Sequence, residues 1–246
     1  MNSKTSTVKI ALVTGANKGI GLEVARQIGH TGAMVLMGAR NAAAGEKAAA
    51  MLTAEGVNAR FIAIDITDRA SIAAAASAIT SEFHRLDILV NNAGINDPAD
   101  GAPATADLDA VERVMRTNFV GTLAVTQAML PLLHNAPAAR IVNVSSGLGS
   151  LTENGNPDFS SAAAKLIGYN ASKAALNMLT VQLAYLLRGT NIKVNSANPG
   201  YTATALNGFS GPQTIPEGAA ETIRLALLPE DGPSGTFSEN EGPVPW

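Results

Sequence analysis

Residues 8–21, VKIALVTGANKGIG, decide the fold. The first half is a short apolar run with β-branched residues, typical of a buried strand. The second half spaces three glycines, at positions 15, 19 and 21, where a helix-forming segment opens. Glycines there let the backbone approach a pyrophosphate, whose charge then lies at the helix N-terminus. The alternative is a structural turn, but the place of the triplet between a strand and a helix favours dinucleotide binding.

The rest of the chain repeats this order of strand and helix. Short β-branched runs alternate with longer alanine-rich stretches, a pattern typical of a parallel sheet covered by helices on both faces. We expect strands at about 8–14, 33–39, 59–65, 86–91, 139–145, 191–197 and 235–239, and helices near 19–31, 42–55, 68–84, 106–134, 163–188 and 216–228. Asp68 and Pro216 stand at suitable helix starts.

This order predicts the α/β class, in one doubly wound Rossmann-type domain that spans residues 1–246. Its sheet is expected to be mostly parallel, with seven strands and helices on both faces. We place the cofactor half at about 1–140 and the catalytic and substrate half at about 141–246. Residues 147–162 and 203–215, rich in Gly, Ser, Asn and Pro, follow strand ends, where ligands bind in such sheets.

Composition argues against several kinds of protein. The 246 residues are 46% hydrophobic and 15% charged, with a net charge of −3 and no Lys/Arg cluster, so neither nucleic acid nor a membrane is an expected partner. Because there is no cysteine, and His30, His84 and His134 are far apart, no metal site is expected. The N-terminus lacks the apolar segment of a signal peptide and no stretch approaches a membrane span, so we expect a cytoplasmic protein that binds small molecules.

The end of the second predicted strand bears on the choice of dinucleotide. NAD sites carry an acidic residue there, which binds ribose hydroxyls of the adenosine. This chain has Ala39 followed by Arg40, and Lys18 lies inside the glycine loop. Each cation could contribute roughly 1.5–3 kcal/mol to binding a 2′-phosphate, less what solvent screening removes. The residues therefore predict NADPH as the cofactor. The alternative is that Lys18 and Arg40 are solvated surface charges.

A second stretch, residues 168–176 with the sequence GYNASKAAL, bears on the chemistry. Tyr169 and Lys173 lie four residues apart, which places both side chains on one face of a helix. A free phenol, with a pKa near 10, is poorly matched to proton transfer at neutral pH. A nearby ammonium lowers such a pKa by roughly 1–3 units. Taken alone, the pair could equally be a half-buried tyrosine beside a surface lysine.

Over nearly all its length the chain resembles the short-chain dehydrogenase/reductase family, and among its members the NADPH-dependent carbonyl reductases. The resemblance rests on TGANKGIG at 14–21, Asp65 after the third strand, NNAG at 91–94, Asn118, Ser145-Ser146, Tyr169-x-x-x-Lys173 and Pro199-Gly200-x-x-x-Thr204. Several independent motifs in the expected order argue against a chance match.

The resemblance implies that Tyr169 is a general acid, which gives its proton to a substrate carbonyl oxygen as hydride reaches the carbon. Lys173 would assist it and hold the nicotinamide ribose, and Ser146 would polarise the carbonyl. Asn118 would hold a water that links Lys173 to solvent, although it could also be an ordinary buried amide. Strand alternation says only that Ser145 and Ser146 point in opposite directions, and the family pattern selects Ser146.

The same resemblance assigns the cofactor, NADP(H), to a second set of residues. The expected contacts are Gly15, Asn17, Lys18, Gly19, Ile20, Gly21, Arg40, Asp65, Ile66, Asn92, Ala93, Gly94, Tyr169, Lys173, Pro199, Gly200 and Thr204. Asp65 would bind the adenine amino group, and capping of the next turn explains it equally well. Thr204 would reach the nicotinamide carboxamide and fix the ring face, so that the pro-S hydride moves.

Two segments depart from the family pattern. Tyr169 follows Ser146 by 23 residues, more than in most short members and far fewer than in monomeric carbonyl reductases. The resemblance implies that in oligomeric members the helices that carry Asn118 and Tyr169 pack against their copies in a partner subunit, and that in the monomers a large insertion blocks this surface. The intermediate loop therefore favours, without deciding, a homodimer or homotetramer. Residues 203–215 would form a mobile lid over the substrate, with Leu206 and Phe209 as apolar contacts.

We therefore expect NADPH-dependent reduction of a ketone, aldehyde or quinone carbonyl to the alcohol, of the carbonyl reductase or alcohol dehydrogenase type. An alternative within the family is a hydroxysteroid or sugar-alcohol dehydrogenase. An alternative of another class is a catalytically silent NADP-binding regulator. Loss of Tyr169 or Lys173 would favour that regulator, and both are present.

Overall fold

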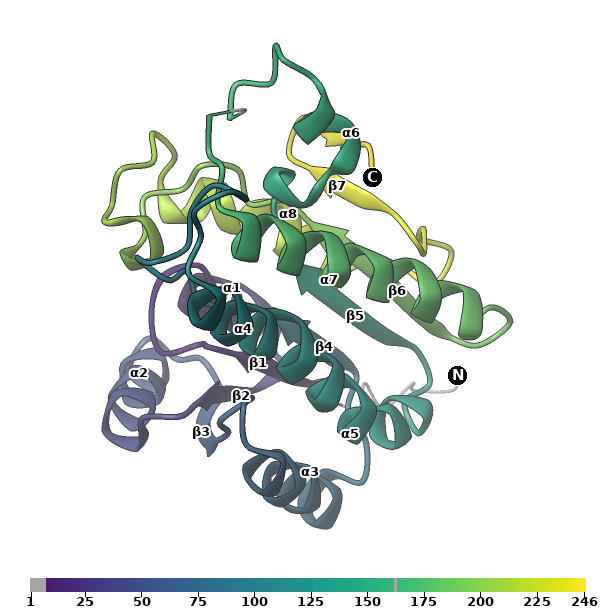
Figure 1. Ribbon diagram of the computed structural model, residues 1–246. Coiled ribbons are helices and arrows are strands. Elements are labelled where there is room, and N and C mark those ends of the chain that lie inside the picture. The colour runs from purple at the N-terminus through teal and green to yellow at the C-terminus, as the bar shows by residue number, and fades with distance from the viewer. Residues whose placement is uncertain (1–7, 162) are drawn as a thin grey trace.

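The strands form one mostly parallel sheet (Figure 1). The computed structural model describes residues 8–161 and 163–246, and within them eight strands lie in the order β3-β2-β1-β4-β5-β6-β7-β8. Their bounds are β1 (Ile10–Thr14), β2 (Met34–Ala39), β3 (Ala59–Ala63), β4 (Ile88–Asn91), β5 (Ala139–Val144), β6 (Ile192–Ala197), β7 (Phe237–Glu239) and β8 (Gly242–Pro243). Only the β7–β8 pair is antiparallel. The predicted doubly wound α/β fold is confirmed, with β8 as one short strand beyond the seven expected.

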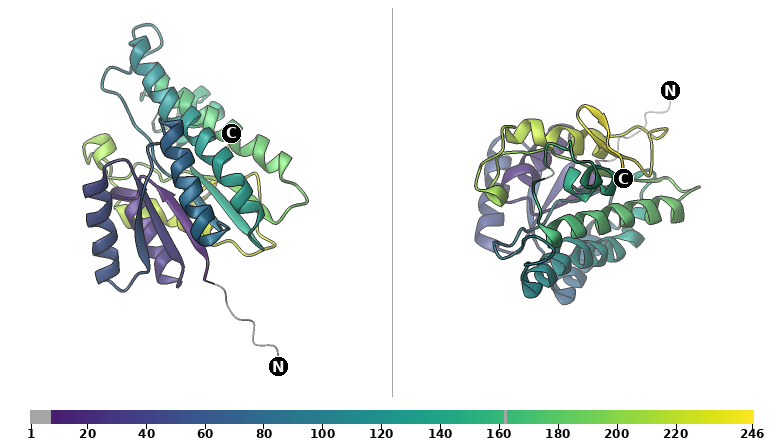
Figure 2. Two further views of the ribbon diagram at one scale, coloured as in Figure 1. Left: turned by 90° about the horizontal axis from the view of Figure 1, so that it is seen from below. Right: turned by 45° about the horizontal axis from the view of Figure 1, so that its top comes forward.

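Helices cover both faces of this sheet (Figures 1 and 2). The α-helices are α1 (Gly19–His30), α2 (Ala42–Ala54), α3 (Arg69–Phe83), α4 (Leu108–Met115), α5 (Thr122–His134), α6 (Leu151–Gly155), α7 (Ile167–Leu186) and α8 (Ile215–Ala226). A π-helical turn η1 (Arg116–Gly121) joins α4 to α5, and 3₁₀ turns η2 (Gly147–Gly149) and η3 (Ala205–Asn207) follow β5 and β6. Among the described residues, no helix has the length and apolar character needed to cross a membrane.

Two hydrophobic cores explain the continuous apolar strands. All five residues of β1 are buried, because successive side chains enter opposite cores. Leu12 packs into the core under α3, α5 and α7, while Val13 packs into the core under α1, α2 and α8. This arrangement leaves the carboxyl ends of β1, β4, β5 and β6 at one edge, where the candidate site lies.

The structure departs from the expected elements most clearly at three places. The helix expected at 106–134 is interrupted by η1, and the segment 147–162 contains η2 and α6, with Ala162 outside the described residues. The helix expected from 163 begins at Ile167, because Leu166 has a non-helical backbone at φ −105° and ψ 84°. Local helix propensity of the alanines before it is overridden by tertiary contacts to the helix start.

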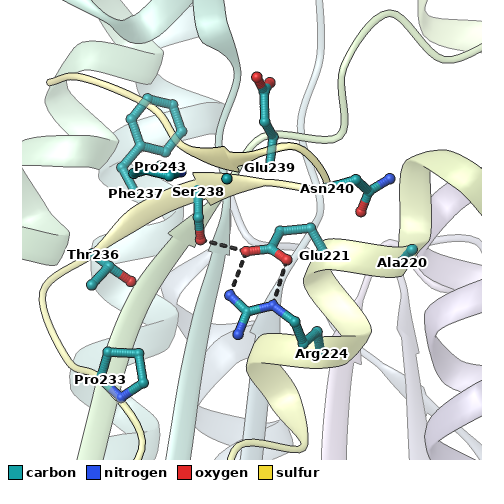
Figure 3. Close-up of a pocket in the computed structure, with 11 residues that line it drawn as sticks. Ala220, Glu221, Arg224, Pro233, Thr236, Phe237, Ser238, Glu239, Asn240 and Pro243 are labelled. Carbon is teal, nitrogen blue, oxygen red and sulfur yellow. Dashed lines mark hydrogen bonds and ion pairs between the residues drawn. The ribbon is translucent and has the colours of Figure 1, made fainter.

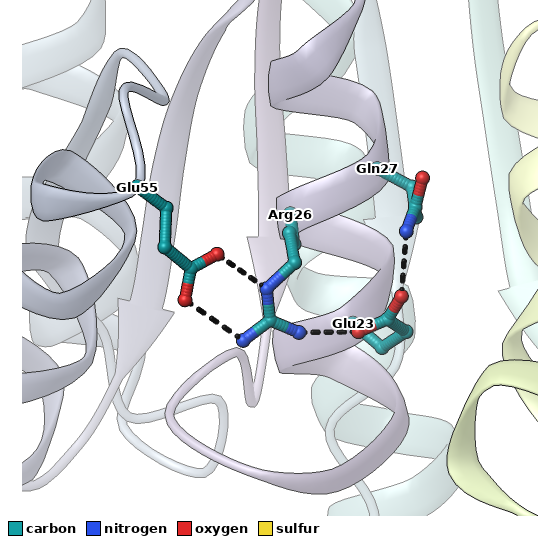
Figure 4. Close-up of polar contacts among 4 residues, drawn as sticks. All are labelled: Glu23, Arg26, Gln27 and Glu55. Atoms are coloured by element: carbon teal, nitrogen blue, oxygen red, sulfur yellow. Dashed lines mark hydrogen bonds and ion pairs between the residues drawn. The ribbon is translucent and has the colours of Figure 1, made fainter.

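An ion-pair network ties α1 to the end of α2 (Figure 4). Arg26 of α1 donates to Glu55, with Nε 2.7 Å from Oε2, and also to Glu23. Glu23 accepts a further hydrogen bond from Gln27 at 2.7 Å. The hydrogen bond with Glu55 is the main cause of a raised Arg26 pKa. The helix that follows the glycine loop is thereby anchored to its neighbour.

Candidate active site

The glycine loop after β1 is shaped to receive a phosphate group. Gly15 and Gly19 have φ of 66° and 58°, in the left-handed region that favours glycine. A Cβ on Gly15 would lie 3.0 Å from the Cα of Ala93, and one on Gly21 would lie 2.6 Å from the carbonyl oxygen of Gly15. Lys18, before α1, makes no side-chain cap. The first amides of α1 therefore have no side-chain partner from the N-cap, and the residues fit a bound pyrophosphate.

The end of β4 holds this loop in place. Asn92 Nδ2 donates to the carbonyl oxygens of Thr14 at 2.9 Å and Gly15 at 3.3 Å. Thr14 Oγ1 accepts the N–H groups of Asn92 and Ala93, both at 3.0 Å. The Asn92 amide, which the sequence assigned to the cofactor, thus supports the loop. Thr14 received no role from the sequence, although a threonine at a strand end beside the glycines was a visible signal.

Arg40 and Asp65 lie near each other at the ends of β2 and β3. Asp65 Oδ1 accepts the N–H and the hydroxyl of Thr67 at 2.9 and 2.7 Å. These two hydrogen bonds, the backbone one first, lower the Asp65 pKa, and the charge of Arg40 adds a smaller effect. Asp65 therefore caps the turn with one oxygen, as one of its two predicted roles required. Lys18 and Arg40 are both exposed, which a solvent-facing phosphate contact needs.

Tyr169 and Lys173 lie on one face of α7, as their spacing predicted. Lys173 Nζ is 5.6 Å from the centroid of the Tyr169 ring and donates to the Val144 carbonyl at 2.8 Å. A Cβ on Gly94 would lie 3.7 Å from Lys173 Nζ and 3.3 Å from Asn118 Oδ1. The ends of β4 and β5 therefore meet η1 and α7 at these residues.

The two serines after β5 have different surroundings. Ser145 is buried, and its hydroxyl donates to the Lys173 carbonyl at 3.5 Å. Ser146 is partly exposed, lies close enough to the Tyr169 phenol to act on its pKa and accepts the Leu148 N–H at 3.2 Å. Ser146 is thus the serine beside the phenol, a distinction that strand alternation alone left open.

Asn118 lies in the π-helical turn and is 1% exposed. Its Nδ2 donates to the Ile95 carbonyl at 2.9 Å and to Ser172 Oγ at 3.0 Å, while its Oδ1 accepts the Ile95 N–H at 2.8 Å. Both amide hydrogens are used within the chain, so its predicted water would bind the backbone carbonyl, which a π turn displaces from the regular helical pattern. Ser172 was missed by the sequence reasoning, and its spacing of three from Tyr169 was the available signal.

The sequence predicted that the Lys173 ammonium lowers the pKa of Tyr169, and this prediction is wrong. Burial raises the pKa of Tyr169 to about 12, and the nearby Ser146 hydroxyl acts in the opposite direction. Burial also lowers the pKa of Lys173 to about 8. The reason for both shifts is that removal from water disfavours the charged form of each group. A sequence pattern shows which residues are neighbours, but it does not show how deeply they are buried.

The segment after β6 lies over the glycine loop. Gly200 has φ 64°, and Thr204 Cγ2 lies 3.9 Å from the position of a Cβ on Gly19. Asn198 Oδ1 accepts the N–H groups of Gly147 at 3.0 Å and Gly200 at 3.1 Å, which ties the ends of β5 and β6 together. The predicted apolar lid residues, Leu206 and Phe209, are both exposed.

Comparison with known proteins agrees with this geometry. Residues 9–214 match the family described as short chain dehydrogenase. The chain belongs to the short-chain dehydrogenase family.

It is similar to carbonyl reductase [NADPH] 1 of Sus scrofa, with 35% identity over 98% of this chain and 96% of that protein. It is also similar to (+)-neomenthol dehydrogenase of Capsicum annuum, with 31% identity over 96% of this chain and 97% of that protein. A solved structure of NADPH-bound carbonyl reductase from chicken fatty liver superposes with a TM-score of 0.84, 30% identity and coverage of 97% and 99%.

A separate cavity of about 520 Å³ in this short-chain dehydrogenase lies between α8 and the β7–β8 edge (Figure 3). Its wall contains Glu221, which accepts two hydrogen bonds from Arg224 at 2.7 Å and one from Ser238. The predicted site residues do not line it. Among residues 8–161 and 163–246, no group of three or more His, Cys, Asp or Glu side chains could hold a metal ion.

Proposed function

We propose that the protein reduces a ketone, aldehyde or quinone carbonyl to the alcohol, with NADPH as hydride donor. One observation supports this most strongly: Lys173 lies beside Gly94 with its Nζ 5.6 Å from the Tyr169 ring, and Ser146 lies near the phenol, at the strand ends that also carry the glycine loop. The likeness to an NADPH-dependent carbonyl reductase over almost the whole chain points the same way. We also propose that a cofactor half, about residues 1–140, holds most of the cofactor and that a second half, about 141–246, supplies most of the catalytic and substrate-binding groups.

The described residues fit the cofactor. The glycine loop and the first amides of α1 would hold its pyrophosphate, while Lys18 and Arg40 would bind the 2′-phosphate. Lys173 and Thr204 would hold the nicotinamide end. When bound, NADPH supplies the hydride that reaches the carbonyl carbon.

Tyr169 supplies the proton in this proposal. Because its pKa is about 12, the phenol is protonated at neutral pH, which the reduction requires. An alkoxide is about as basic as hydroxide and is a much stronger base than a phenolate, so the proton moves downhill from the phenol. Ser146 donates a hydrogen bond to the same oxygen and stabilises its developing charge.

The direct test is Tyr169→Phe, assayed as NADPH oxidation with a panel of ketones, aldehydes and quinones. General acid catalysis typically contributes about 10²–10⁴-fold, so we expect kcat to fall by at least two orders of magnitude while the Kd for NADPH is unchanged. Tyr185→Phe is the matched control, since Tyr185 is an exposed tyrosine on the same helix. Activity of Tyr169→Phe within a few-fold of the parent would rule out the proposed acid.

A further inference from the structure

The first turn of α7 contains Tyr169, and its backbone amides need partners from outside the helix. The residue before the helix, Leu166, makes no side-chain capping hydrogen bond. In this 20-residue helix, the first amides have no acceptor within the helix and lie at the positive end of its dipole. The group that meets them determines how firmly the start of the helix is held.

Asp100 meets these amides, although it precedes Tyr169 by 69 residues. Its Oδ2 accepts the N–H of Tyr169 at 2.8 Å, and its Oδ1 accepts the N–H of Gly168 at 2.9 Å. The neighbouring carbonyl of Gly101 accepts the N–H of Ile167 at 2.9 Å. Asp100 is only 8% exposed, so these charge-assisted hydrogen bonds form where little water competes.

The other side of the same residue is held as well. Ser172 Oγ donates to the Tyr169 carbonyl at 2.8 Å and accepts a hydrogen bond from Asn118 at 3.0 Å. The backbone that positions the phenol is therefore bound at its N–H by Asp100 and at its C=O by Ser172.

Gly168 allows Asp100 to come this close. A Cβ on Gly168 would lie 3.1 and 3.2 Å from the two carboxylate oxygens of Asp100 and 3.0 Å from the Cα of Val111 in α4. Such contacts are tighter than ordinary van der Waals distances, so a side chain here would push α7 away from α4 and from the carboxylate.

The segment that contains Asp100, residues 95–107 before α4, is itself anchored at the site. Its first residue, Ile95, is bound at both its N–H and C=O by the Asn118 amide. Asp97 pairs with Arg113 of α4 at 2.9 Å. The Asp100 carboxylate thus links an anchored segment to the backbone of Tyr169.

We propose that Asp100 is a positioning residue, which sets the place of the Tyr169 phenol through the two amides that it binds. The inference rests on the proposed function, in which Tyr169 is the acid. A carboxylate suits this role because each of its oxygens accepts one amide. An asparagine has a single acceptor oxygen and would turn its NH₂ group toward the second amide.

The test compares Asp100→Asn and Asp100→Ala with the parent in NADPH-dependent ketone reduction. Misplacement of the acid should lower kcat about 10- to 100-fold for Asp100→Asn, and further for Asp100→Ala, which keeps no acceptor. The KM for the ketone and the Kd for NADPH should stay within about twofold of the parent, because Asp100 belongs to neither binding surface. If the role of Asp100 were purely structural, the substitutions would reduce the amount of folded enzyme. They would not lower kcat while KM and Kd stay unchanged.

Asp107→Asn is the matched control. Asp107 lies in the same segment and caps α4 through the Ala110 N–H at 2.7 Å, but α4 does not contain the acid. At a comparable loss of thermal stability, its kcat should remain within about twofold of the parent. If the Asp100 variants do not fold, Gly168→Ala must lower kcat in the same way with an unchanged Kd for NADPH.

Two results would overturn the role of Asp100 while the proposed function stands. In the first, Tyr169→Phe is inactive but Asp100→Asn, or Gly168→Ala in its place, keeps kcat within about twofold of the parent. In the second, Asp107→Asn loses kcat to the same extent as Asp100→Asn. If Tyr169→Phe retains full activity, the proposed acid and its positioning residue fall together.

Discussion

The ionisable residues of the site are governed by burial more than by their neighbours. Lys173 is 5% exposed and its ammonium has one short hydrogen bond, to the Val144 carbonyl. A single neutral acceptor does not replace the hydration of a cation, so the charged form is disfavoured. The result is a phenol that stays protonated and an amine that titrates near the physiological range.

A pH dependence follows from the Lys173 pKa of about 8. Below this pH the Lys173 amine is protonated and charged. Above it the amine loses the charge that would hold the ribose and the proton that it would return to Tyr169. We expect kcat/KM for NADPH in ketone reduction, which reports the protein before cofactor binding, to fall as pH rises through about 8. A profile measured from neutral to alkaline pH checks this, and a flat profile would contradict it.

The cofactor preference depends on an exposed cation. Arg40→Asp removes a partner of the 2′-phosphate and adds a repelling charge, so we expect the ratio of kcat/KM for NADPH over NADH to fall roughly 10- to 100-fold. Arg188→Asp makes the same change of charge beyond the end of α7, far from the glycine loop, and should leave the ratio unchanged. An unchanged ratio in Arg40→Asp would remove this residue from phosphate recognition.

At the scale of elements, the π-helical turn η1 positions Asn118 at the candidate site. It interrupts what would otherwise be one long helix and places Asn118 against the backbone of Ile95. Its last residue, Gly121, meets the segment after β3, because a Cβ there would lie only 2.6 Å from the Ile66 carbonyl oxygen. The absence of a side chain at Gly121 thus allows this close approach to Ile66, which the resemblance assigns to the cofactor.

Gly121→Ala should therefore destabilise the protein. Alanine gains roughly 1 kcal/mol over glycine in a helix, but the contact with a backbone oxygen cannot relax by rotating a side chain. We expect a net loss of about 1–3 kcal/mol in the free energy of unfolding, measured in urea. Gly155→Ala in α6 is the control, because a Cβ there meets nothing within 4 Å. A gain in stability for Gly121→Ala would show that the close approach yields easily.

At the scale of the whole molecule, a buried polar chain joins three neighbouring strands of the sheet to α7. Asn91 Nδ2 donates to Asn143 Oδ1 at 2.8 Å, Asn143 Nδ2 donates to Thr180 Oγ1 at 2.7 Å, and Thr180 shares a hydrogen bond with Ser196 at 2.8 Å. All four residues are buried. The chain therefore connects β4, β5, α7 and β6, the elements whose ends form the site.

Asn143→Ala should remove the centre of this network. It leaves Asn91 and Thr180 each without one partner in a buried place, so we expect a loss of about 2–4 kcal/mol in the free energy of unfolding. Denaturant titration measures it, with Asn240→Ala as the control, since Asn240 is exposed. A loss no larger than that of the control would mean that the network contributes little to stability.

The oligomeric state stays a prediction. Helix α7 exposes large apolar side chains, among them Met178, Tyr185 and Leu186. These lie on a helix that the family resemblance assigns to subunit contacts, so a homodimer or homotetramer would bury them.

The sequence by itself determined the fold class, the order of the main strands and helices, the family and the set of candidate site residues. Their signals are local: apolar periodicity marks buried strands, glycines mark backbone that approaches a ligand closely, and a spacing of four marks one helix face. The interruption at η1, the start of α7 at Ile167 and the helix α6 were not predicted, because contacts between distant segments override local propensity there.

Only the tertiary structure decided how burial shifts the pKa values of Tyr169 and Lys173, and that Asp100 binds the start of α7. Each of these depends on groups that are distant in the chain but adjacent in space, and on how much water remains between them. A sequence motif records residue types and spacing, whereas desolvation and hydrogen-bond partners arise when the whole chain has packed.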